Sequence, residues 1–458
     1  MKGLYLIQYS VKGIKTLNEL VSLSFYKKTF TKGMDIRGYN VKGIYGMNGS
    51  GKSAIITSVG ILKNILMNSE YLSNAIVQKN LDAIINKEIG ELFIEVDFLV
   101  QSVLQMFRYT IKLEKEKSGK YVIAYEKLAT KKATSKNDSM LTLLEVNKGE
   151  LVCDNKERQD DFLSLFEKKT TNLLETSSMC AIFIDKRIYE IRDEFSELSR
   201  DVRFNSMMLL GIFGMSLHVY LDNSDDHKDF LLENFLLPFK YYEGKKNIDF
   251  GQLKFILNDF VDIDSEYIDI LSVSENYILK DEYKQFERRV NKLCEFLQIF
   301  KSDLRKIEID KKEDKEYYIC SLLMVYDSYK IHGEFESTGI KKLINLFVYL
   351  KEMVCGGIVF IDEFDSNLHD VYLCALLEYL MEHGEGQLCF TTHNVGPMDI
   401  LKRNKKSIDF LSEDHKIYPW KNSGNYSPSR LYRNGMIEGS PFNIDSIDFI
   451  GIFEEEDE

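Results

Sequence analysis

Proline is scarce in this sequence, and segments typical of linkers or membrane spans are missing. Only 5 of the 458 residues are proline, and no proline-rich or Gly/Ser-rich stretch separates one part of the chain from another. The length allows two or three domains, or one with large insertions, and the missing linkers favour one continuous globular body. The longest apolar run, residues 207–221, is short for a membrane span and predicts a buried core helix. Since no signal peptide is visible, we expect a soluble cytoplasmic protein without membrane contact.

Paired cysteines and an excess of positive charge are also absent. The 7 cysteines include no C-x-x-C pair, which argues against a zinc site and a disulfide framework and favours reduced thiols. The formal net charge of -13 argues against a bulk electrostatic affinity for nucleic acid. Local basic patches at 341–342 and 402–406 are either a nucleic-acid groove or ordinary solvated surface. The acidic run 454–458 predicts a disordered tail.

The chain does contain a complete phosphate-loop pattern, G-x-x-x-x-G-K-[ST]. Its glycines let the backbone curl so that N–H groups point at phosphate oxygens. Lys52 is expected to reach the β- and γ-phosphates of ATP, and the Ser53 hydroxyl is expected to coordinate Mg²⁺. The loop residues expected to bind the nucleotide are Gly46, Asn48, Gly49, Ser50, Gly51, Lys52 and Ser53.

The segments on either side of this loop fit the same interpretation. Residues 41–45 predict a strand that runs into the loop, and residues 53–68 predict a helix with apolar side chains at helical spacing. Phosphates would then lie at the N-terminus of a helix, where the backbone amides favour anions. A chance glycine-rich turn is the alternative, and the flanking strand and helix argue against it.

A second apolar strand, residues 358–361, ends in two carboxylates. Its uninterrupted apolar run is typical of a strand buried on both faces of a parallel sheet. Asp362 is expected to hold Mg²⁺ through water as the acidic partner of Ser53. Glu363 is expected to orient and deprotonate the attacking water. Two solvated acids at a strand end are the alternative.

Two further motifs complete the candidate site. His393 ends the predicted strand 387–393, and at that position it can contact the γ-phosphate and sense the nucleotide state. Ser337 and Gly339 precede a predicted helix and present a hydroxyl and bare backbone at its N-terminus, which suits a γ-phosphate contact. A structural histidine and a local helix cap are the alternatives.

The remaining pattern predicts strands before and after a helical middle region. Residues 283–304 carry apolar side chains with a period of about 3.5 residues, which predicts either an amphipathic helix on its own core or a short coiled-coil arm. Asp225 and Asp226 are interpreted as a loop pair. The strands are expected at 4–9, 21–25, 91–99, 106–113, 120–128, 304–310, 317–326 and 328–335, and a helix at 340–354.

The order of these motifs resembles that of ATP-binding-cassette (ABC) ATPases, with residues 365–369 in the place of the D-loop. The long separation between Lys52 and Ser337 resembles the RecF, SMC and OLD (overcoming lysogenization defect) branch. Residues 336–339 and 362–369 look like the E-S-x-G and D-E-x-x-x-x-L-H patterns of OLD-like ATPases. Ile340 and Asp370 depart from the usual threonine and proline, and the Q-loop glutamine has no good candidate, since Gln78 fits poorly.

This resemblance implies an α/β fold, an ABC-type ATPase head with a mixed sheet and a P-loop core. It also implies an antiparallel β insertion and a helical insertion. The expected parts are an N-terminal half-head at 1–130, a mostly helical insertion at 131–303 with the heptad helix, and a C-terminal half-head at 304–458. In this architecture Ser337 and Gly339 of one protomer complete the ATP site of another, so that ATP joins two heads in a dimer or larger assembly.

The resemblance also implies a biological role. Standalone OLD-like ATPases are often subunits of bacterial anti-phage systems, such as the PARIS system and abortive-infection systems, where they act as sensors or scaffolds. The segment after His393 is too short for the Toprim nuclease domain of OLD nucleases. We therefore expect ATP hydrolysis with Mg²⁺, control of a separate effector such as a nuclease or toxin, and a phage-encoded trigger.

Two other functions stay open on the sequence. One is a DNA-repair ATPase of the RecF or SMC type, which would clamp DNA between heads, so that DNA binding is undecided. The other is a self-contained nuclease or toxin with its active site within residues 130–300.

Overall fold

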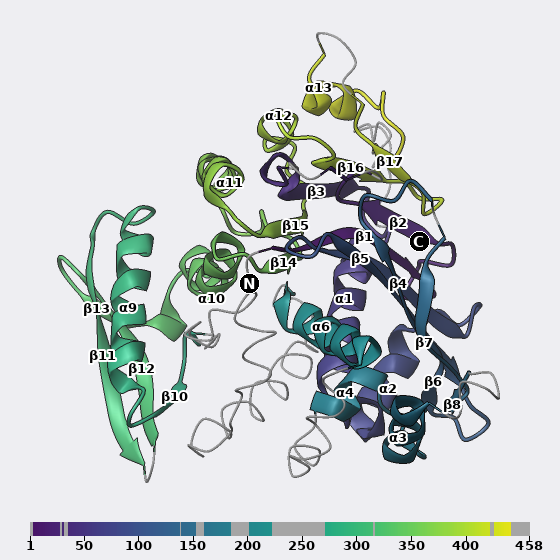
Figure 1. Cartoon of the computed structure of the whole chain (residues 1–458). Coiled ribbons are helices and arrows are strands. Elements are labelled where there is room, and N and C mark those ends of the chain that lie inside the picture. The colour runs from purple at the N-terminus through teal and green to yellow at the C-terminus, as the bar shows by residue number, and fades with distance from the viewer. Residues whose placement is uncertain are drawn as a thin grey trace, which may run out of the picture.

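The computed structural model describes residues 3–27, 30–31, 35–137, 139–152, 160–184, 201–221, 271–314, 317–421 and 426–440. The pair Asp225–Asp226 and the acidic run 454–458 lie outside these ranges. Figure 1 shows three sheets with helices between and around them. The mixed α/β class predicted from the sequence is confirmed at this level.

The central sheet has the strand order β17-β16-β3-β15-β14-β9. Its five strands from β16 to β9 are parallel, and β17 is an antiparallel edge strand. Since the carboxyl ends of parallel strands meet at one edge, the segments after β3, β14 and β15 are brought together there. The strands are β3 (Val41–Gly46), β9 (Leu217–Tyr220), β14 (Ile358–Ile361), β15 (Gln387–Thr391), β16 (Ile408–Leu411) and β17 (Ile417–Pro419).

Helices cover both faces of this sheet. On one face α1 packs against β3, β9, β14 and β15 and against α6, and on the other face α10, α11 and α12 pack (Figure 1). The helices around this sheet and around the antiparallel sheet are α1 (Lys52–Met67), α2 (Ala75–Ile84), α3 (Asp161–Thr170), α4 (Met179–Ile184), α6 (Val202–Ser216), α10 (Thr338–Val354), α11 (Asp370–His383), α12 (Met398–Leu401) and α13 (Pro428–Arg433).

A second, antiparallel sheet has the order β2-β1-β4-β5-β6-β7-β8. The strands β4 to β8 were expected as an insertion after the phosphate loop, whereas here they continue a sheet that β1 and β2 begin before the loop. Ser118 and Gly119 lie in the predicted hairpin turn between β5 and β6. The strands are β1 (Leu4–Lys12), β2 (Val21–Ser24), β4 (Glu91–Val100), β5 (Gln105–Lys115), β6 (Tyr121–Lys132), β7 (Leu141–Asn147) and β8 (Glu150–Leu151).

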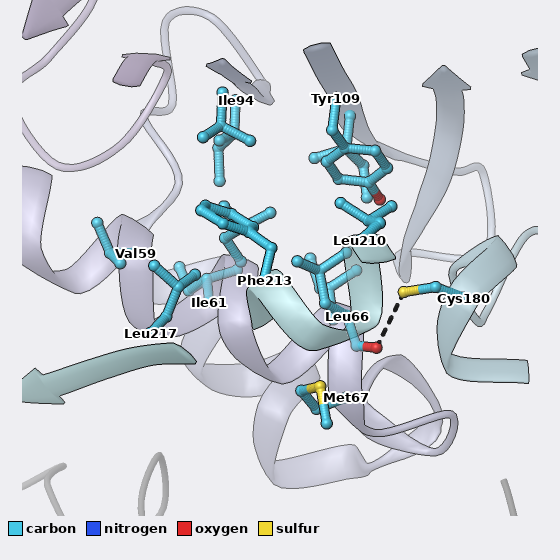
Figure 2. Close-up of a cluster of buried hydrophobic side chains, with 14 of the residues drawn as sticks. Val59, Ile61, Leu66, Met67, Ile94, Tyr109, Cys180, Leu210, Phe213 and Leu217 are labelled. Carbon is cyan, nitrogen blue, oxygen red and sulfur yellow. Dashed lines mark hydrogen bonds between the residues drawn. The ribbon is translucent and has the colours of Figure 1, made fainter. Parts of the chain in front are cut away.

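The largest core lies between the antiparallel sheet and helices α1, α4 and α6. Figure 2 shows side chains of α1 and α6, among them Leu66 and Phe213, facing Ile94 and Tyr109 of the sheet. The two sheets are also joined directly, because the buried amide of Gln387 at the start of β15 exchanges two hydrogen bonds with the backbone of Leu6, at 2.6 and 2.9 Å. This packing fixes the position of α1, and with it the phosphate loop.

The prediction of one helix over residues 207–221 is wrong for the end of this run. The apolar run was expected to be a single buried helix, but α6 ends at Ser216 and Leu217–Tyr220 form β9. These four residues pair in parallel with Ile358–Ile361 of β14, as the last strand in the described sheet order, and are buried on both faces. The run is buried, as expected, and continuous apolar character alone does not distinguish a helix from such a strand.

A third unit is a sheet of order β10-β12-β11, with β13 paired to β12 and α9 packed on one face. The heptad residues Phe286, Val290, Leu293 and Leu297 point into this local core, and the helix ends before Leu304, which begins β11. The interpretation as an amphipathic helix on its own core therefore accounts for the period. The elements are β10 (Asn276–Leu279), α9 (Tyr283–Gln298), β11 (Leu304–Asp314), β12 (Tyr317–Tyr326) and β13 (Lys330–His332).

Helix α10 lies between this third unit and the central sheet. Residues near its start, such as Ile340 and Ile344, belong to the core with α9, whereas residues near its end, such as Leu350 and Met353, belong to the core under the central sheet. Short 3-10 helices lie at Arg37–Tyr39, Tyr71–Ser73 and Gly333–Phe335. The region expected to be mostly helical, 131–303, contains helices together with the short strands β7 to β10. The three proposed parts of the chain, 1–130, 131–303 and 304–458, stay predictions.

Candidate functional site

The phosphate-loop pattern forms the connection between β3 and α1, as the sequence predicts. Gly51 precedes α1 with a left-handed φ of 102°, and a Cβ there would lie 2.4 Å from the side chain of Leu17. Gly49 also has a left-handed φ of 78°, and a Cβ there would meet no atom within 4 Å. Asn48 and Gly49 are exposed. The loop is therefore closely packed at Gly51 and open to solvent at Asn48 and Gly49.

Lys52 lies against the loop that precedes it. Its ammonium donates hydrogen bonds to the carbonyls of Gly46 and Met47, at 2.9 and 2.8 Å, and the residue is 6% exposed. Burial lowers the pKa of Lys52 to about 8, although the carboxylates of Asp362, Glu363 and Asp365 oppose the shift. A partly desolvated ammonium at the mouth of the loop gains from any anion bound there.

Ser53 and Asp362 come together from distant parts of the sequence. The Ser53 hydroxyl donates to the Asp362 carboxylate at 3.0 Å, and Thr391 of β15 donates to the same carboxylate oxygen at 2.5 Å. Asp362 is 5% exposed. The structure thus brings together the two side chains predicted to hold the metal.

These residues fit a bound nucleoside triphosphate with its metal. The Ser50 hydroxyl is buried, and no hydrogen-bond partner is found for it among the described residues, so it can donate to a phosphate oxygen held by the loop. Within the described ranges no three His, Cys, Asp or Glu side chains form a metal-ion cluster. The oxygens of Ser53 and Asp362 match the ligands that Mg²⁺ takes when substrate phosphates and waters supply the rest.

Glu363 directly follows Asp362 in a strained conformation. Its φ of 47° is left-handed, which is uncommon for a residue other than glycine, asparagine or aspartate. Its amide donates to Thr391 Oγ1 at 2.8 Å, so Thr391 holds both adjacent acids. The Glu363 carboxylate is close enough to Lys52 to affect the pKa of that lysine. Strain of this kind concentrates at functional sites.

His393 lies beyond the end of β15, at the same edge of the sheet, and is exposed. Partial burial and the nearby charge of Lys52 lower its pKa, while the carboxylates of Asp365 and Asp362 oppose the shift. The histidine is therefore near the loop lysine and both acidic residues, as its predicted place beside the γ-phosphate requires. Its sensing role stays a prediction.

Ser337, which is exposed, and Gly339, which is partly buried, lie at the N-terminus of α10. Ser337 caps the helix, because its hydroxyl accepts from the amide of Ile340 at 3.5 Å. The local cap is therefore real, and a phosphate contact by Ser337 stays a prediction. A Cβ on Gly339 would lie 2.7 Å from the carbonyl oxygen of Asn367. Larger residues at 339 would displace the loop after β14, so this position is not a neutral place to test phosphate contact.

Some residues at the site were not found from the sequence. Thr391 carries no motif signal, since only the packing of β15 between β3 and β14 places its hydroxyl beside Asp362. Thr16 also touches the loop, donating to the Gly49 carbonyl at 3.4 Å. Gln78 has a structural role, as its side-chain amide bonds the carbonyls of Leu72 and Tyr121.

The basic run at 402–406 is tied to its own chain. Lys402 pairs with Asp399 and Arg403 pairs with Glu378, at 3.0 and 2.7 Å. Lys406 donates to the hydroxyl of Ser24 at 2.6 Å. These contacts agree with the interpretation as ordinary surface. Among the described residues, none of the helices has the length and apolar composition needed to cross a membrane.

Comparison with known proteins adds little to this geometry. No known protein family and no curated protein matches the sequence. Among solved structures, the chain is similar to the recombination mediator protein RecF, described as RecF-ATPrS of the RecFOR pathway. The sequences are 13% identical, the match covers 92% of this chain and 99% of that chain, and the TM-score is 0.39. At this TM-score the likeness does not establish a family.

Proposed function

We propose that the chain binds ATP with Mg²⁺ and hydrolyses it to ADP and phosphate. The contact between Ser53 and Asp362 carries this proposal, because it joins the phosphate loop to the carboxylate strand at 3.0 Å. The bound Mg²⁺ would polarise the phosphates and neutralise charge on them. The loop amides and Lys52 would hold the β- and γ-phosphates, and Ser53 and Asp362 would hold the metal. Glu363 would accept a proton from the attacking water.

The proposed architecture is an ABC-type head of the OLD-like, RecF and SMC kind. In it, two copies would join face to face. ATP would lie between the phosphate loop of one copy and residues 336–339 of the other, which are called the Ser337 turn. The exposure of Ser337 at the start of α10 supports this arrangement, since backbone amides at a helix N-terminus favour phosphate. His393 would report the state of the nucleotide to the assembly.

The proposed biological role is that of a nucleotide-dependent sensor or scaffold in bacterial anti-phage defence. The chain would hold or release a separate effector, a nuclease or toxin, in response to a phage-encoded trigger. A ligand can bias two states of such an assembly only through different contacts in each state, and ATP between two heads provides such a difference.

Incubation of the purified chain with DNA and RNA tests this division of labour. With Mg²⁺ or Mn²⁺ and ATP, we expect slow release of phosphate and no cleavage of either nucleic acid. Cleavage that survives Glu363→Gln but is lost when carboxylates between 130 and 300 are replaced would make the chain a self-contained nuclease. Tight, ATP-dependent DNA binding without cleavage would favour the DNA-repair function instead.

A further inference from the structure

Lys342 of α10 contacts the segment that carries the proposed water-activating carboxylate. Its ammonium donates hydrogen bonds to the backbone carbonyl of Glu363 and to the hydroxyl of Ser366. It also lies 5.9 Å from the centre of the Tyr220 ring. The lysine is 4% exposed, so it does not belong to a basic surface patch at residues 341–342, which the sequence had left open. Burying an ammonium costs free energy unless hydrogen bonds satisfy it, so the lysine needs these contacts to stay buried.

The same face of α10 contacts the loop at a second place. Thr338, one helical turn before Lys342, donates its hydroxyl to the Asn367 side chain at 3.3 Å. At Gly339 the helix backbone comes so close to the Asn367 carbonyl that a Cβ would lie 2.7 Å from it. Because residues four apart share one side of a helix, Thr338 and Lys342 hold the two ends of the loop from Glu363 to Asn367.

The loop held in this way has a left-handed φ at both ends, and the conformation is strained at Glu363. Glu363 and Asn367 have left-handed φ values of 47° and 58°. Asparagine adopts this conformation readily, but glutamate keeps it only when the surrounding structure imposes it. The contacts of Lys342 with the Glu363 carbonyl and of Thr338 with the Asn367 side chain are the constraints that α10 supplies. The direction in which the Glu363 carboxylate leaves the backbone therefore depends on α10.

We propose that Lys342 is a positioning residue, which couples the Ser337 end of α10 to the Glu363 carboxylate. The inference rests on the proposed function, in which Glu363 activates water and Ser337 meets nucleotide bound to a second copy. A contact at Ser337 that shifts or steadies α10 would change the placement of Glu363 through the Lys342 ammonium. Hydrolysis would thereby be linked to docking of the second copy, while nucleotide binding at the phosphate loop would not need Lys342.

The test compares Lys342→Met with Lys341→Met. Methionine keeps the length of the apolar stem and removes the ammonium. Lys341 is the matched control, since it is the neighbouring lysine and its ammonium donates only weakly, at 3.3 Å, to the carbonyl of Glu334. We expect Lys342→Met to lower kcat at least about tenfold and to leave the Kd for a non-hydrolysable ATP analogue within about twofold. Lys341→Met is expected to change neither value more than about twofold.

A second variant guards against misfolding of Lys342→Met. Ser366→Ala removes only the hydroxyl partner, and we expect it to lower kcat about threefold in the wild-type background and not at all in the Lys342→Met background. Melting temperatures identify an unfolded variant, and if Lys342→Met does not fold, the kcat of Ser366→Ala alone decides.

The outcomes separate this inference from the function on which it rests. An unchanged kcat in folded Lys342→Met, or an equal loss of kcat and nucleotide affinity, overturns the positioning role alone. If Lys342→Met does not fold, wild-type kcat in Ser366→Ala overturns it. Absence of ATP hydrolysis by the wild-type chain overturns the proposed function and the positioning role together.

Discussion

The candidate site has two halves, which differ in how many of their polar groups are fixed by contacts within the chain. The first half is the phosphate loop with Asp362 and Glu363, and the second half is the turn at residues 336–339. In the first half, Lys52 and Asp362 are buried, and each has partners of its own chain that fix its position. In the second half, Ser337 and Thr338 are exposed and serve a helix cap and a loop contact. Burial and hydrogen bonding thus organise the phosphate loop in advance, whereas the Ser337 turn presents its groups to solvent.

This difference indicates what each half needs. We expect the first half to bind a nucleotide by itself, because its amides, its lysine and the proposed metal ligands converge at one edge of the central sheet. The second half is exposed at Ser337 and Thr338, and we propose that it acts only when a second copy brings phosphate to it. Variants in the two halves should therefore fail differently.

The largest effect is expected from Glu363→Gln in the first half. The amide keeps the size of the side chain but cannot take a proton from water, so we expect kcat to fall about 100-fold or more. ATP and Mg²⁺ should bind as in the wild type, because the loop and Asp362 are untouched. Steady-state phosphate release and nucleotide titration measure the two quantities. Release at the wild-type rate would mean that another group activates the water.

Ser337→Asp, compared with Ser337→Asn, tests the second half. Both residues cap helices well, so α10 should stay folded in each. The aspartate places a negative charge where a partner's phosphate is expected, and we predict about tenfold slower hydrolysis, or slower still, for this variant. The asparagine variant should stay within a few-fold of the wild type. Equal activity of the two variants would show that Ser337 is only a helix cap.

Mixing Lys52→Ala with Ser337→Asp sharpens the same comparison. If the halves act across two copies, a dimer of Lys52→Ala with Ser337→Asp has one intact site and one site with both defects. Phosphate release from the mixture should then exceed that from either variant alone. An assay of the mixture at increasing protein concentration checks this, since the gain should require association. No gain at any concentration would contradict a site shared between copies.

A smaller effect is expected at a buried carboxylate away from both halves. Glu126 is fully buried and accepts hydrogen bonds from the Tyr109 hydroxyl at 2.7 Å and from the Met179 amide at 2.9 Å. Burial raises its pKa from 4.5 to about 7, although both hydrogen bonds oppose the shift. Between these values the folded chain keeps a proton that the unfolded chain has lost. The free energy of unfolding should therefore fall as the pH rises through this window.

Glu126→Gln should remove that dependence. We expect the variant to be more stable than the wild type at pH 8 by about 1 to 3 kcal/mol, with a flatter profile between pH 5 and 7. Denaturant unfolding at several pH values measures this, and ATP hydrolysis serves as the control that should not change. A variant less stable than the wild type at pH 8 would show that the charged carboxylate is well paired.

The elements that the sequence predicted well are those where one local pattern had one meaning. The alternation of apolar residues gave β4, β5 and β6, and the apolar run before Asp362 gave β14. Leu217–Tyr220 were assigned to a helix, because their partner in the sheet, β14, lies far away in the sequence. The sequence also did not show that β1 and β2, before the phosphate loop, share one antiparallel sheet with β4 to β8, after it. Here too the pairing strands lie far apart in the sequence.

The candidate site divides in a similar way. The phosphate loop, Asp362 and Glu363 were visible as motifs, because their chemistry needs fixed residue types at fixed spacing. Thr391 and Lys342 were not found, since each is defined by what it contacts in space and not by its sequence neighbours. Lys342 was even grouped with Lys341 as surface charge, and only its burial separates the two.

Titration of ATP with the wild-type chain and with Lys52→Ala tests the central claim most directly. The claim is that the segment between β3 and α1 holds the phosphates of ATP. Removing the ammonium should weaken binding at least tenfold, which is about 1.4 kcal/mol, while the variant melts at the wild-type temperature. Unchanged ATP affinity in a folded Lys52→Ala variant, or no ATP binding by the wild type, would contradict it.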